Sequence, residues 1–169
     1  MQGVTIPRNV KVRSHRFTDF FKGFEKITAV RERFGDRTEE VLQDLKVEFI
    51  SSRHGYMWID DAEGHIVICV DYLKHGDEQE IYLDLIHELV HVRQFMEGKE
   101  LFDNQVEYAD RPTEIEAYEH VVKEAKRLGM SDSEILGYLK TDWMSDDEVL
   151  KLAQRAGVTP KAVKAEQDE

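Results

Sequence analysis

The sequence of 169 residues has a single cysteine, three prolines and no long apolar run. One cysteine excludes a disulfide within the chain, and Cys69, in the apolar run IVICV, is expected to be a small buried residue. The N-terminus lacks the apolar segment of a signal peptide, and no apolar run approaches the roughly 18 residues of a transmembrane helix. We therefore expect a soluble, cytoplasmic protein without a membrane partner.

Basic charge is scarce as well, because 23 Lys and Arg residues face 35 Asp and Glu residues and the formal net charge is -12. General nucleic-acid binding and binding to anionic membranes both need basic surfaces, so the composition argues against them. One local exception consists of Arg8, Lys11, Arg13 and Arg16. We expect these residues to form a solvated arm or an edge strand, not a nucleic-acid patch.

Several enzyme motifs are also missing: the sequence has no phosphate-binding glycine loop, no paired-cysteine zinc knuckle and no nucleophile elbow. An apolar fraction of 41% is nevertheless enough for a core, and the length fits one domain with a small appendage. Apolar periodicity predicts the elements of its first part. These are an extended arm (1–15), a helix (16–34), a short helix or turn (37–46), a strand (47–51) and a β-hairpin (55–60 and 65–71), whose second strand should be buried on both faces.

The sequence IYLDLIHELVHVRQF, residues 81–95, contains the pattern His-Glu-x-x-His. Residues four apart lie on one face of a helix, so His87 and His91 can offer two imidazoles to one metal ion. Glu88 lies beside them and can act as a general base, as in zinc metallopeptidases. The predicted helix, 79–96, is apolar nearly all round and should be buried, so its histidines must be satisfied inside the protein.

A polar loop (99–111) and a second helix (113–128, after Pro112) follow. Two capping boxes, Ser131 with Glu134 and Ser145 with Glu148, predict two short helices, and Thr159-Pro160 begins a possible third. We therefore expect a main domain over residues 1–128 and a small helical appendage over residues 129–169.

A zinc site of this kind needs a third protein ligand and an open position for water. The best source is the segment 111–120, which holds two candidates, Glu114 and Glu116. They are two residues apart, about 200° round a helix, so only one of them can face the metal.

His-Glu-x-x-His followed some twenty-odd residues later by a helix with Glu-Ala resembles the gluzincin branch of the zincin metallopeptidases, and most closely the small minigluzincins. The resemblance covers residues 47–128. It implies an α+β, zincin-like fold, in which a small mixed or antiparallel sheet packs on the His-Glu-x-x-His helix and on a second, ligand-bearing helix. It also implies one zinc ion per chain, held by His87, His91 and Glu116, the glutamate immediately before the alanine.

The resemblance implies a metallopeptidase that hydrolyses peptides or unfolded proteins, with Glu88 as the general base and a strand before the helix pairing with the substrate backbone. That strand would be 55–60 or 65–71. A further donor must stabilise the oxyanion. Residue chemistry leaves four candidates open for this role: Tyr108, Arg111, Tyr118 and His120.

Three residues differ from the family pattern: Asp84, Arg93 and His120. They motivate an alternative, a latent or non-catalytic zinc-binding module whose cleft is covered by the N- or C-terminal segment. His120 could also accept a hydrogen bond from a ligand or bind the metal itself, and Glu119 could take the hydrogen-bonding role instead. A third hypothesis is a core helix with two buried histidines and no metal.

Overall fold

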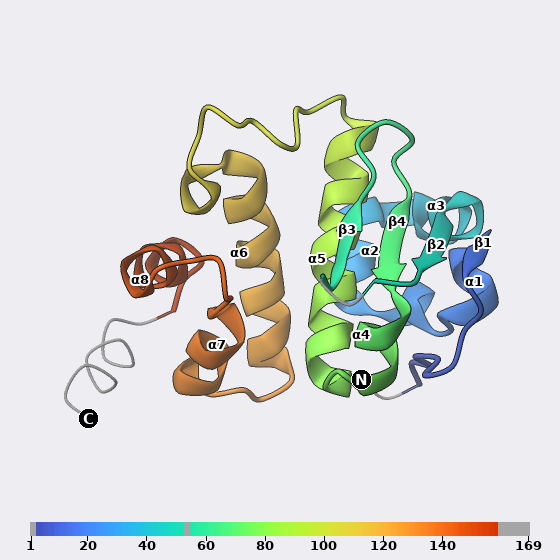
Figure 1. The fold of residues 1–169 in the computed structure, drawn as a ribbon, viewed down its shortest axis with the longest axis horizontal. Helices are drawn as coiled ribbons and strands as arrows, with labels where there is room; N and C mark the ends of the chain where they lie inside the picture. The colour runs from blue at the N-terminus through green and yellow to red at the C-terminus, as the bar shows by residue number, and fades with distance from the viewer. Residues whose placement is uncertain (1–2, 53–54, 159–169) are drawn as a thin grey trace. The chain divides into compact units, whose positions relative to one another are not determined.

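The computed structural model describes residues 3–52 and 55–158 (Figure 1). The chain forms two compact units, Met1–Leu101 and Phe102–Glu169. The boundary between the units falls in the polar loop after the His-Glu-x-x-His helix, whereas the sequence predicted a boundary after residue 128. None of the helices in the described part of the chain is both long and apolar enough to cross a membrane.

The first unit contains a mixed four-stranded sheet, which agrees with the predicted α+β class. Its strands have the order β1-β2-β4-β3, with β2 parallel to β4 and the two outer pairs antiparallel. The basic segment supplies the edge strand β1, in agreement with one of the two predicted roles for its charges. The four strands are β1 (Arg13–Arg16), β2 (Lys46–Ile50), β3 (Met57–Ile59) and β4 (Ile66–Cys69).

The predicted hairpin is formed by β3 and β4. Its turn is held by Asp60, whose side chain accepts hydrogen bonds from the backbone of Ala62 and Glu63. Gly64 completes the turn with a φ of 71°, a value that favours glycine. Every residue of β4 is buried, as predicted for a strand covered on both faces.

The predicted single helix over residues 16–34 is wrong. The structure has three pieces instead: α1 (Phe17–Phe20), the 3₁₀ helix η1 (Phe24–Lys26) and α2 (Thr28–Phe34). The break has a tertiary cause, because the arm residue Thr5 pairs with Lys22 and takes its backbone groups out of any helix. Gly23 then adopts a φ of 85°, where an added Cβ would lie only 2.1 Å from the carbonyl oxygen of Gly3.

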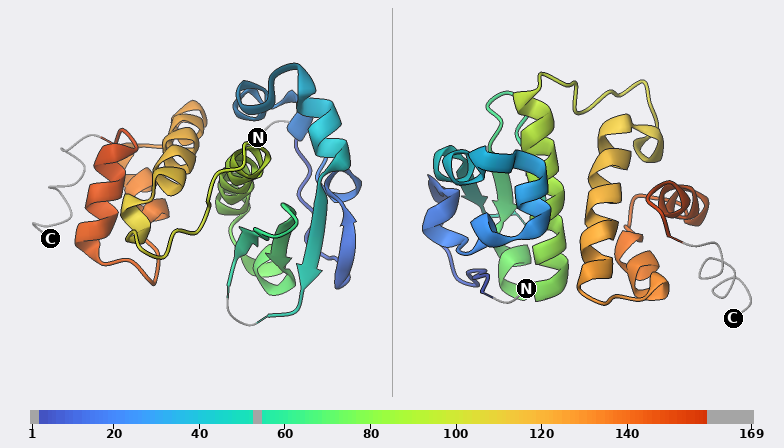
Figure 2. Two further views of the ribbon diagram at one scale, coloured as in Figure 1. Left: turned by 90° about the horizontal axis from the view of Figure 1, so that it is seen from above. Right: turned by 180° about the vertical axis from the view of Figure 1, so that it is seen from behind.

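The apolar stripe that predicted this helix lies largely in the core, since Phe17, Phe21 and Phe24 are buried, although Phe20 and Ile27 are only half-buried. The predicted short helix is α3 (Thr38–Asp44). In Figure 2, α2 and α5 (Glu78–Met96) lie on the same side of the sheet.

The structure adds a helix that the sequence did not predict, α4 (Val70–His75), in what was assigned to the end of a strand and a polar connection. Asp77 then caps α5, since its side chain accepts hydrogen bonds from the backbone of Gln79 and Glu80. Twelve of the 19 residues of α5 are buried, which confirms the predicted buried central helix.

The second unit is helical in its described residues. It comprises η3 (Tyr108–Asp110), α6 (Pro112–Arg127), α7 (Asp132–Leu139) and α8 (Asp146–Arg155). Both predicted capping boxes are present, at Ser131 and Ser145. The possible third helix at Thr159-Pro160 lies outside the described residues.

A candidate metal centre on the central helix

Two imidazoles lie together on one face of α5. Nε2 of His87 and Nε2 of His91 are 2.9 Å apart, and both residues are buried, with 7% and 3% of their surfaces exposed. Two nitrogen ligands of a tetrahedral zinc ion, each at 2.0–2.1 Å, are separated by about 3.3 Å. The helix therefore holds the two nitrogens within a few tenths of an ångström of the spacing that one metal ion requires.

Gln94 contacts the second histidine from the next turn of α5. Oε1 of Gln94 lies 2.7 Å from Nδ1 of His91, and Gln94 is fully buried. Gln94 was not among the site residues predicted from the sequence, although its spacing of three from His91 places it on the same side of the helix.

The predicted general base, Glu88, is also buried, with 7% of its surface exposed. It directly follows His87 in the central part of the helix, away from both ends. A buried carboxylate beside a pair of imidazoles is an uncommon arrangement, because an ionised acid is rarely removed from water without a compensating partner or function.

A third residue completes a possible ligand set. His87 and His91 on α5 and Glu114 on α6 are all buried. This group could hold a metal ion. Two histidines and one glutamate form the ligand set of several catalytic zinc sites.

The glutamate in this group is the alternative that the sequence left open, not the favoured Glu116. Within α6, Glu114 is 2% exposed, whereas Glu116 is half-buried and does not join the metal-binding group found among the described residues. Helical periodicity explains why Glu114 is buried, because it lies three and four residues before buried Ala117 and Tyr118. The apolar stripe of α6 was therefore a signal in the sequence for the burial of Glu114.

Tyr108 supports Glu114 within the second unit. Its hydroxyl group lies 3.0 Å from that of Tyr118 and is hydrogen-bonded to the Glu114 side chain. Burial, followed by the nearby Tyr118 and Glu114, raises the pKa of Tyr108 well above 10, so its hydroxyl stays protonated. An ionised carboxylate can only accept, and Tyr108 is therefore placed to donate to it.

The other oxyanion candidates have different surroundings. Arg111 donates from Nε to the backbone oxygens of Asp103 and Val106, at 3.0 and 3.2 Å, and so holds the loop before α6. His120 is half-buried and lies six residues beyond Glu114, about 240° round the helix, so it does not share the face of Glu114. Tyr118 lies one turn after Glu114 and is hydrogen-bonded to Tyr108.

Two departures from the family pattern have structural roles in the first unit. Asp84 accepts a hydrogen bond of 2.5 Å from the Tyr72 hydroxyl and so joins α5 to α4. Burial, and then the Asp84 carboxylate, raise the pKa of Tyr72, which keeps this donor protonated. Arg93 forms an ion pair of 2.7 Å with Glu97, and about a third of each side chain is exposed. These contacts account for both residues without assigning them to the metal group.

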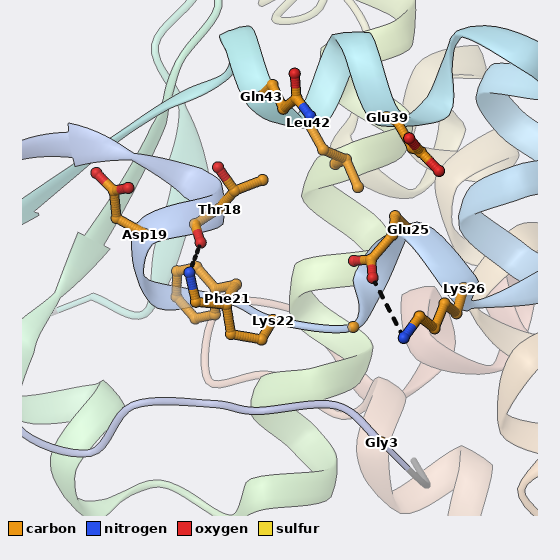
Figure 3. A pocket seen from close by; sticks show the side chains of 11 residues that line it. Gly3, Thr18, Asp19, Phe21, Lys22, Glu25, Lys26, Glu39, Leu42 and Gln43 are labelled. Atoms are coloured by element: carbon orange, nitrogen blue, oxygen red, sulfur yellow. Dashed lines mark hydrogen bonds and ion pairs between the residues drawn. The ribbon is translucent and has the colours of Figure 1, made fainter.

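A separate surface pocket of about 560 Å³ lies over the N-terminal segment of the first unit (Figure 3). It is lined by the arm, α1, η1 and α3, and none of its residues belongs to α5. Lys26 lies 3.9 Å from Glu25, and Lys22 donates to the backbone oxygen of Thr18. The pocket thus contains charges of both signs and lacks the convergent ligands that distinguish the metal group.

Comparison with known proteins gives no match: no family model matches the chain, and neither does any curated protein or solved structure. Only the residues of the site therefore indicate a function.

Proposed function

We propose that the protein is a zinc-dependent peptidase of the gluzincin type, with His87, His91 and Glu114 as zinc ligands and Glu88 as the general base. The observation that carries the proposal is the buried group of two histidines and one glutamate. A metal-free core helix explains these residues poorly, because burying charged and polar side chains costs free energy that metal binding would offset.

Zinc, when bound, supplies a Lewis acid that activates water near neutral pH and polarises a peptide carbonyl. Glu88 then takes the proton of the attacking water and transfers it to the leaving amine. The buried position of Glu88 next to His87 supports this role. Tyr108 holds the Glu114 carboxylate through its hydrogen bond, which fixes the side chain of the proposed ligand.

Strand β3 offers one of the two edges of the sheet to the backbone of a peptide substrate. Strand β4 lies between β2 and β3 and cannot accept another strand, so of the two predicted candidates only β3 lies at an edge. Strand β3 packs beside α5, as Figure 1 shows. Its central residue, Trp58, is 38% exposed, which leaves an aromatic side chain to contact a substrate that pairs with this edge.

Metal analysis and two matched glutamate variants test the proposal. The purified protein should contain about one zinc ion per chain, as our proposed ligand set requires. Glu88→Gln should retain this zinc and lose cleavage of an unstructured protein such as casein, because the variant cannot accept a proton. Glu78→Gln, a change at an exposed position of the same helix, should retain both properties.

The alternative functions give different results in the same experiment. A latent enzyme would bind zinc and cleave casein only after limited proteolysis, whereas a non-catalytic module would bind zinc and remain inactive. Truncation after residue 128 does not distinguish them, because α8 holds the η3 turn: Lys151 and Arg155 contact Asp110, and Arg155 also contacts the backbone of Ala109. Absence of zinc from the wild-type protein, even after zinc is added, would contradict the proposal.

A further inference from the structure

Gln94 is the most deeply buried polar residue near the metal group, with 0% of its surface exposed. A buried amide destabilises a protein unless its polar atoms find partners. Here Oε1 lies 2.7 Å from Nδ1 of His91, three residues earlier on α5. This contact determines which ring nitrogen of His91 carries a hydrogen.

The hydrogen bond selects a tautomer. An amide oxygen can only accept, so Nδ1 of His91 must carry a hydrogen. A neutral imidazole carries one ring hydrogen, so Nε2 of His91 is left with a lone pair, and this lone pair faces Nε2 of His87 at 2.9 Å. This is the form in which Nε2 can bind a metal ion.

We infer that Gln94 is a positioning residue, which holds His91 in the Nδ1–H tautomer and directs its Nε2 into the metal group. The inference rests on the proposed function, because it assigns Gln94 a role toward a metal ligand. Residues that hydrogen-bond to a ligating histidine fix its ring orientation, and loss of such a partner typically weakens metal binding about 10- to 100-fold.

The backbone around Gln94 is fixed by the end of the helix. Lys99 donates from its backbone N–H to the carbonyl of Gln94 at 3.0 Å, and Gly98 donates to the carbonyl of Phe95 at 2.9 Å. With Gly98 at a φ of 73°, these two bonds form a Schellman motif. Gln94 therefore extends from a rigid final turn, and its amide reaches His91 from a fixed position.

Three variants separate this role from simple packing. Gln94→Met keeps a side chain of similar length and removes the acceptor, whereas Gln94→Glu keeps an acceptor oxygen. Gln79→Met is the matched control, because Gln79 lies in the first turn of the same helix, away from the histidines. Zinc affinity is measured by competition with a chelator, and the ring-nitrogen tautomers of the metal-free proteins by ¹⁵N NMR.

We expect Gln94→Met to lower zinc affinity about 10- to 100-fold, and Gln94→Glu and Gln79→Met to bind zinc at least nearly as tightly as wild type. In the metal-free wild type, His91 should be protonated at Nδ1, and Gln94→Met should lose this preference. Protonation at Nε2 in the wild type would overturn the inference without any variant, as would unchanged zinc affinity in a folded Gln94→Met.

Different results would contradict the proposed function and the role of Gln94. If the wild type binds no zinc, the proposed function fails, whereas the tautomer of His91 in the metal-free protein still decides whether Gln94 orients it. If zinc binds and the tautomer is protonated at Nε2, the proposed function stands and the role of Gln94 is wrong.

Discussion

His87 and His91 meet through their Nε2 atoms at 2.9 Å on the central helix α5. Two neutral imidazoles at this distance can share one hydrogen. A metal ion would replace that single contact by two coordinate bonds. The pair thus makes the site partly preformed, with consequences for stability as well as for chemistry.

Zinc should raise the melting temperature of the protein. A ligand that binds only the folded state, present at 100 times its dissociation constant, adds about 2.7 kcal/mol to the free energy of unfolding. Thermal unfolding followed by circular dichroism, with zinc and with a chelator, measures the shift. His87→Ala should abolish the shift, and an equal response of this variant to zinc would show that the ion binds elsewhere.

The third ligand can be identified by a pair of substitutions in α6. Glu114→Gln should lower zinc affinity by at least about tenfold, because it removes a charged ligand from a buried site. Glu116→Gln, two residues along the same helix, should leave the affinity within about twofold of wild type. Chelator competition measures both affinities. If Glu116→Gln lowers zinc affinity and Glu114→Gln does not, Glu116 is the third ligand, as the family resemblance implies.

Gly64→Ala should destabilise the first unit. An added Cβ would lie 2.3 Å from two ring carbons of Phe95, on backbone with a φ of 71°. Overpacking and left-handed strain together predict a loss of about 2–5 kcal/mol in the free energy of unfolding. Gly98→Ala is the control for strain alone, since its φ is 73° and nothing lies within 4 Å of its added Cβ. If urea denaturation gives the same loss in free energy of unfolding for Gly64→Ala and Gly98→Ala, the contact with Phe95 has no effect.

Asp110 should make the second unit sensitive to acid. Lys151 and then Arg155 lower the pKa of its carboxyl below the ordinary 3.8. A lowered folded-state pKa stabilises the protein above the unfolded pKa, and this stability is lost as the pH falls through the folded pKa. The melting temperature of wild type should therefore exceed that of Asp110→Asn at pH 7.

The difference between these two proteins should narrow below about pH 3.8 and vanish at lower pH. Melting temperatures measured from pH 2 to pH 7 test this course. The control is Asp142→Asn, an exposed position in the same unit, which should follow wild type throughout. If the difference in melting temperature between wild type and Asp110→Asn does not change with pH, the ion pairs of Asp110 contribute nothing to stability.

Local signals in the sequence predicted much of the fold. Capping boxes, the turn before Gly64 and the apolar character of the central helix each act within a few residues, and the structure contains all three. The break at Gly23 was not predictable in this way, because its cause is the pairing of Lys22 with Thr5, 17 positions earlier. Periodicity identified the buried phenylalanines but not the path of the backbone between them.

The candidate site also combines residues that local sequence signals predict with residues whose role depends on tertiary packing. His87, Glu88 and His91 follow from spacing alone, since residues four apart share a helical face. The sequence alone left Glu114 and Glu116 open, because the burial of Glu114 depends on which face of α6 packs inward, whereas the alanine after Glu116 favours that residue. Gln94 was missed because a glutamine in a helix carries no signal until a buried histidine is found beside it.

The two edges of the sheet differ in charge. Strand β1 carries Arg13 and Arg16 at one edge, whereas Met57, Trp58 and Ile59 form the other edge without a single charge. Charged edges resist pairing with a second chain, and uncharged ones invite it. The net charge of -12 keeps copies apart at neutral pH, but this repulsion disappears near the isoelectric point of about 5.0. Aggregation on mild acidification should therefore begin at β3.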